Sequence, residues 1–170
     1  MNKTCEVDCI RARLLTTAVE GIKPVYAVLF QREKTPWPVT LQELEQLPEG
    51  SLGNSLARFL SDNGFSLLPL YENHDVYHVL LGYDAEVTDE AAMQFFLLGN
   101  RKITPSVVIT VFFSLLLLPE HASKFLREYR RGQRCTRIGK WEFLHLLKEP
   151  LSVLKALVFK TPVENPPVMF

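Results

Sequence analysis

Apolar residues recur along this chain every three to four positions, which predicts helices and no convincing strand. Glycines, prolines and capping residues divide the pattern into segments. Thr40-Leu41-Gln42-Glu43 has the spacing of a capping box, and Asn63-Gly64 is typical of a helix end. The expected helices span residues 7–20, a segment opened by Pro24, 40–47, 51–62, 70–83, 88–98, 106–118, 121–131, 140–147 and a segment from Pro150. We therefore expect an all-α fold, a single compact helical domain of about seven to nine helices over residues 1–170, with a Pro-rich tail at 161–170.

The most apolar expected helix covers residues 106–118 and lies between Pro105 and Pro119. Its apolar run is too short to cross about 30 Å of hydrocarbon as a helix. Ser106, Thr110 and Ser114 recur every four residues and form a stripe of small side chains, which would let another helix approach closely. We expect a buried central helix here rather than a membrane-inserted one.

Composition excludes some classes of protein. The 170 residues suffice for one domain with its own core, and 47% hydrophobic content argues against disorder. Lys plus Arg and Asp plus Glu number 19 each, so no overall charge calls for nucleic acid. The three cysteines are odd in number and follow no apolar leader, which favours a cytoplasmic protein. Cys5 and Cys9 are one helical turn apart, but without a second ligand pair we interpret them as incidental thiols.

The chemistry of the chain is concentrated in His74-Asp75-Val76-Tyr77-His78, with Glu90 at the head of the next expected helix. On a helical wheel with His74 at zero, His78 falls at about 40° and Asp75 at about 100°, on one side. The other side carries Val76, Val79 and Leu80. Gly82, at about 80°, would leave room beside the two histidines. Two imidazoles and two carboxylates suit a borderline divalent ion such as zinc.

The spacing alone leaves other interpretations open. His and Asp on one face can form a solvated hydrogen-bonding stripe, and an acid such as Glu90 is favoured in the first turn of any helix. The zinc-protease pattern H-E-x-x-H has the same spacing, but Asp75 replaces its glutamate and is one methylene shorter. An HD-type phosphohydrolase needs a histidine on an earlier helix, and none precedes His74.

The run from Tyr71 to Asp84, with Glu90 twelve residues after His78, resembles the Coq-four family of coenzyme Q (ubiquinone) biosynthesis proteins. The hallmark of that family is H-D-x-x-H followed by eleven residues and Glu, and all four positions match. The segment Leu47-Pro48-Glu49-Gly50-Ser51-Leu52-Gly53 is similar to the family's L-P-x-G-[ST]-L-G. The pairs Trp141-Glu142 and Pro150-Leu151 are similar to its C-terminal W-E and P-L.

The resemblance implies an all-helical protein, peripheral to the membrane, that binds isoprenoid-tailed quinone precursors and helps to organise the ubiquinone-making enzymes. It implies a divalent metal, zinc, at the hallmark residues. It further implies a metal-dependent, oxidative decarboxylation of a prenylated hydroxybenzoate. The rival interpretations are a non-catalytic lipid-binding scaffold and a divergent metallohydrolase. We expect a homodimer in the cytoplasm, on the inner face of the cytoplasmic membrane. The four expected metal ligands are His74, Asp75, His78 and Glu90.

Two further features bear on lipid binding. A basic cluster lies between Lys124 and Lys140, with Glu128 as the only acidic residue among them. It could bind an anionic membrane surface, or it could be a solvated helix face. A lipid cavity would have Gly82 at its polar end and the stripe of Ser106, Thr110 and Ser114 along its wall. Phe95, Phe96, Phe112 and Phe113 could line it, although aromatic residues in such helices usually form plain core. The arginines of the expected headgroup site are Arg127, Arg130, Arg131, Arg134 and Arg137.

Overall fold

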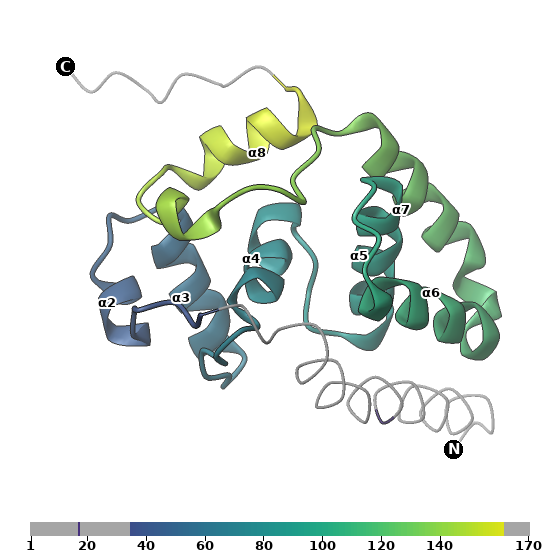
Figure 1. Ribbon diagram of the computed structural model, residues 1–170, viewed down its shortest axis with the longest axis horizontal. Helices are drawn as coiled ribbons and strands as arrows, with labels where there is room; N and C mark the ends of the chain where they lie inside the picture. Colours follow the sequence, from purple (N-terminus) through teal and green to yellow (C-terminus); the bar gives the residue numbers. More distant parts are fainter. Residues whose placement is uncertain (1–16, 18–34, 162–170) are drawn as a thin grey trace. The chain divides into compact units, whose positions relative to one another are not determined.

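The computed structural model describes residue 17 and residues 35–161 (Figure 1). The helices expected before residue 35, the thiols of Cys5 and Cys9, and the tail from residue 162 lie outside the described residues. Within that part of the chain there are seven α-helices, two short 3-10 helices and no strand. The prediction of an all-α fold is confirmed, while the single-domain boundary at 1–170 stays a prediction.

One compact unit contains residues 37–82 and 135–161. Its elements are α2 (Leu41–Glu45), α3 (Leu52–Asp62), α4 (Glu72–Leu81), the 3-10 helix η2 (Phe143–Leu146) and α8 (Leu151–Phe159). The predicted capping box is present at α2: the Thr40 hydroxyl accepts from the Glu43 N–H, and the Glu43 carboxylate accepts from the Thr40 N–H. Ser51 caps α3 in the same way through the Asn54 N–H. Leu56, Val76 and Leu80 are fully buried in the core of this unit.

The segment 47–53 pairs with the segment before α8. The N–H of Leu52 donates to the carbonyl of Glu149 at 2.9 Å, and the N–H of Gly53 donates to that of Leu147 at 2.8 Å. The Leu151 N–H returns a bond to the Gly50 carbonyl at 2.9 Å. A Cβ on Gly53 would strike the end of the Leu47 side chain and lie 3.1 Å from the Leu147 carbonyl oxygen, so the small glycine favours this close approach. Segment 47–53 and the pair Pro150-Leu151, both similar to family motifs, are therefore hydrogen-bonded to one another and connect the two stretches of chain that form this unit.

A second compact unit contains Tyr83–Arg134. It consists of α5 (Val87–Gly99), α6 (Pro105–Leu117), the 3-10 helix η1 (Pro119–His121) and α7 (Ala122–Arg134). The most extensive packing between two helices of this unit is that of α5 on α7, where Gly99 and Gly132 let the two backbones approach closely. A Cβ on Gly99 would strike the Tyr129 carbonyl oxygen, and one on Gly132 would strike the Phe96 carbonyl oxygen. The Asn100 side chain donates to the Gly132 carbonyl at 3.1 Å, which satisfies a buried acceptor at this contact.

Helix α6 begins as predicted, with the Thr104 hydroxyl accepting from the Val107 N–H and Pro105 in the first turn. The expectation of a buried central helix is wrong. The small stripe is what packs: Thr110 is 4% exposed and Ser114 is 0%. Because α6 packs against α5 by its small side, its large side chains face outward. The exposed ones are Val108, Phe112, Leu115 and Leu116.

No single helix among the described residues is long and apolar enough to cross a membrane. Helix α6 and the segment Pro119–Arg134 satisfy the criterion of length and composition only when taken together, and they are bent by 105° at their junction.

Two predicted boundaries are wrong. The helix expected at 88–98 instead begins at Val87, after an extended Glu86 whose side chain makes no cap, and ends at Gly99. The expected helix 140–147 is only the 3-10 helix η2, preceded by turns. In this segment only Phe143 and Leu147 are buried apolar side chains, and they do not form the continuous apolar face of an α-helix.

Candidate metal centre

Helix α4 carries both histidines and is fixed at both ends. At its start the buried carboxylate of Glu72 accepts the Trp37 N–H at 2.9 Å. At its end Gly82 is left-handed, with φ 76°, and its N–H donates to the His78 carbonyl at 2.9 Å. Gly82 therefore ends the helix and does not extend the ligand face at about 80° as the wheel predicted. The glycine is exposed and a Cβ there would meet nothing within 4 Å, so its part in a lipid cavity stays a prediction.

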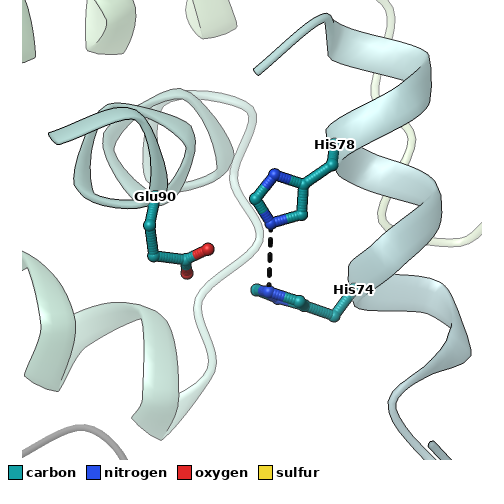
Figure 2. A group of neighbouring side chains, drawn as sticks. All are labelled: His74, His78 and Glu90. Atoms are coloured by element: carbon teal, nitrogen blue, oxygen red, sulfur yellow. Dashed lines mark hydrogen bonds between the residues drawn. The ribbon is translucent and has the colours of Figure 1, made fainter. Parts of the chain in front are cut away.

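The two imidazoles face one another across one turn of α4. Their Nε2 atoms are 3.3 Å apart, and the rings meet edge to face with centroids at 5.0 Å (Figure 2). His78 is only 5% exposed, and its ring stacks on Phe59 of α3 at 5.2 Å with an interplanar angle of 18°. Stacking on one side and the second imidazole on the other restrict the rotation of this ring. The opposite side of α4 is core, as predicted for Val76 and Leu80.

Glu90 lies in the first turn of α5, where an acid is favoured by the helix dipole. Its carboxylate Oε1 accepts a hydrogen bond of 2.7 Å from the side-chain amide of Gln94, one turn later. The neighbouring Asp89 instead pairs with Lys124 on α7. The two acids in this turn therefore have different roles, and only Glu90 is a candidate metal ligand.

His74, His78 and Glu90 form a group that could hold a metal ion (Figure 2). Each offers one ligand atom, and these atoms all lie within 4.8 Å of one another. These are three of the four residues predicted from the sequence, and their role as ligands stays a prediction. Asp75 is not a member of the group, and its role as a ligand stays a prediction.

The donor set and its spacing fit zinc. Two imidazole nitrogens and a carboxylate oxygen are the ligand types of catalytic zinc sites with an open position. Two nitrogens that each lie about 2.0–2.1 Å from a tetrahedral ion are about 3.3 Å apart. The Nε2 atoms of His74 and His78 have this separation, which neutral rings can also keep by sharing one hydrogen bond.

The predicted basic cluster contains two kinds of residue. Arg127, Arg130, Arg134 and Arg137 are exposed. Arg131 is instead integrated in the fold: its guanidinium donates to Glu128 at 3.1 Å and lies over the rings of Phe96 and Tyr83. Its charge is therefore partly used within α7, and the cluster offers fewer charges to a partner than the sequence suggested.

Tyr83 is a buried residue that the sequence analysis did not single out. Its hydroxyl donates to Glu128, and burial together with this carboxylate raises the pKa of the phenol above its usual range. Nothing in the local sequence pairs a tyrosine with a glutamate 45 positions later.

The phenylalanines that could line a lipid cavity differ in their surroundings. Phe95 stacks on Phe125 at 4.7 Å and Phe96 is fully buried, so both are part of the core. Phe112 is exposed.

Comparisons with known proteins agree with the resemblance seen in the sequence. The family model of the coenzyme Q (ubiquinone) biosynthesis protein Coq4 matches residues 68–158, which include α4 and α5. A crystal structure from Nostoc punctiforme PCC 73102, named as that of a ubiquinone biosynthesis protein, is similar with a TM-score of 0.60 and 25% identity. The similarity covers 87% of this chain and 80% of the Nostoc chain. No curated protein matches the sequence significantly.

Proposed function

Because the chain belongs to the Coq4 family of coenzyme Q (ubiquinone) biosynthesis proteins, we propose that His74, His78 and Glu90 bind one divalent ion, zinc, in a site for quinone precursors. The observation that carries the proposal is the 3.3 Å separation of the two Nε2 atoms together with the nearby carboxylate. Three protein ligands leave zinc at least one position for a water molecule or a substrate oxygen.

The substrate we propose is an isoprenoid-tailed hydroxybenzoate. When bound, the ion would polarise the carboxylate or phenolate oxygens of the ring as a Lewis acid and would hold the ring in place. Loss of the carboxylate as carbon dioxide also requires a proton, from solvent, on the ring carbon. The residues of the chain bind and orient: the imidazoles donate their Nε2 lone pairs, and Glu90 supplies a negative charge that partly neutralises the ion. Zinc has no redox chemistry, so an oxidative step would need dioxygen with another metal, or a partner enzyme.

Metal content of purified protein tests the site. His78→Ala should lose most of the bound ion, because the helix offers no other imidazole at that position. His145→Ala is the matched control, since His145 is exposed on η2 and is not part of the group. Equal metal in wild type and His78→Ala would refute the assignment, as would a wild type that binds no zinc in a titration. Asp75→Asn, measured alongside, tests whether Asp75 is a fourth ligand.

Turnover distinguishes an enzyme from a scaffold. Incubation of the zinc-loaded protein with a prenylated hydroxybenzoate should release carbon dioxide, and His78→Ala should not. If wild type binds the lipid without turnover, the protein presents the precursor to other enzymes of the pathway. One observation favours this second function: α6 exposes Phe112 and Leu116 to 62% and 64%, as a lipid-contacting helix would. In both cases we propose a homodimer at the inner face of the cytoplasmic membrane; analytical ultracentrifugation tests the dimer.

A further inference from the structure

Gln94 is a polar residue in the most apolar part of α5. It is 6% exposed, and the residues on both sides of it, from Ala91 to Leu97, are buried. A buried carboxamide without a hydrogen-bond partner is destabilising by roughly 1–3 kcal/mol. A leucine or methionine at this position would avoid that cost, so the glutamine is more informative than its neighbours.

The Gln94 amide donates to Oε1 of Glu90 at 2.7 Å. Donor and acceptor are four residues apart on one helix, so the bond is set by the helical repeat and does not depend on a mobile segment. This distance is short for an N–H···O bond, as is typical where the acceptor is an ionised carboxylate. The bond fixes the rotation of the Glu90 side chain and occupies one lone pair of Oε1.

We infer that Gln94 is a positioning residue that orients the Glu90 carboxylate as a metal ligand. The inference rests on the proposed metal site and adds the residue that holds its carboxylate in place through the bond to Oε1. Hydrogen-bonded partners of ligating side chains typically change metal affinity by about 10–100-fold when removed.

The test is the zinc affinity of Gln94→Met, which keeps nearly the same length and volume but has no donor. Competition against a chromophoric chelator should show about 10–100-fold weaker zinc binding. Gln133→Met is the matched control, because Gln133 is exposed on α7 and should leave affinity unchanged. The thermal midpoint of the metal-free protein shows whether the variant is still folded, and so separates a change in stability from a change in zinc affinity.

A second readout follows the coordination itself. Cobalt(II)-loaded wild type and Gln94→Met should differ in their visible absorption, because a released carboxylate changes the number of oxygens at the ion. If Gln94→Met is poorly folded, Gln94→Asn, whose amide is one methylene shorter, should show the same loss of affinity. Wild-type affinity and an unchanged cobalt spectrum in these variants would overturn the role of Gln94 while leaving the metal site intact. No zinc or cobalt binding by wild type would overturn both.

Discussion

Tyr83 shows how one buried side chain organises charges around it. Its hydroxyl donates to the Glu128 carboxylate, which also accepts from Arg131. Replacing it with phenylalanine leaves the carboxylate with one donor fewer in a half-buried position. Because hydrogen bonds to charged groups contribute about 1.5–3 kcal/mol, we expect Tyr83→Phe to lower the free energy of unfolding by that amount. Urea denaturation at pH 7 measures it, and an unchanged midpoint would show that water replaces the phenol without cost.

The same residue predicts a dependence of stability on pH. Burial raises the pKa of Tyr83 above its usual value of about 10, so the unfolded chain releases this proton at a lower pH than the folded one. The stabilising contribution is therefore complete below pH 10 and is lost as pH rises further. Wild type should lose stability more steeply above pH 10 than Tyr83→Phe does. Some slope should persist in the variant, because burial also raises the pKa of Tyr77. Equal slopes would contradict the assignment to Tyr83.

At the scale of elements, the contact between α5 and α7 depends on glycine. A Cβ on Gly132 would collide with the Phe96 carbonyl oxygen, a backbone atom that cannot turn away as a side chain can. We expect Gly132→Ala to destabilise the protein by about 3 kcal/mol through separation of the helices. Gly64→Ala is the control: its site is open, and only the left-handed φ of 67° adds a cost of about 1–2 kcal/mol. Thermal unfolding of both variants compares them, and equal losses would refute the close contact.

The elements also show what a sequence can predict. The helix starts at Thr40, Ser51 and Thr104 were predictable, because each capping bond joins residues three apart. The pairing of His74 with His78 was predictable for the same reason. The exposure of α6 was not predictable, because composition shows that a helix is apolar but does not show which of its sides packs against another helix. The bond from Gln94 to Glu90 follows helical spacing, yet its importance depends on the burial of Gln94, which spacing does not give.

At the scale of the whole molecule, zinc should stabilise the folded state. The proposed ligands come from two helices, so an ion that binds all three favours the native state by mass action. At a free zinc concentration of 100 times Kd the gain is about 2.7 kcal/mol. We expect zinc to raise the thermal midpoint of wild type and to leave His78→Ala unchanged. A zinc-independent midpoint in wild type would argue against the site.

The last prediction concerns the partner of the exposed apolar face. Phe112 and Leu116 of α6 are followed, on α7 of the same unit, by the exposed Arg127, Arg130 and Arg134. Exposed apolar side chains and exposed cations in one unit suit an anionic lipid surface, where each cation contributes about 1 kcal/mol. The protein should therefore float with anionic vesicles at low salt and not with neutral ones. Binding should weaken as salt approaches 0.1 M and beyond, because the Debye length there is about 10 Å.

Two variants separate the apolar from the electrostatic contribution to this binding. Phe112→Ser should reduce flotation at every salt concentration without lowering stability, because the ring is 62% exposed. Arg130→Gln should reduce it mainly at low salt, where the charge is unscreened. If a second copy of the chain covers this face instead, Phe112→Ser would shift a dimer towards monomer in sedimentation, and wild type would not bind vesicles of either kind. That result would assign the exposed face of α6 to self-association rather than to lipid.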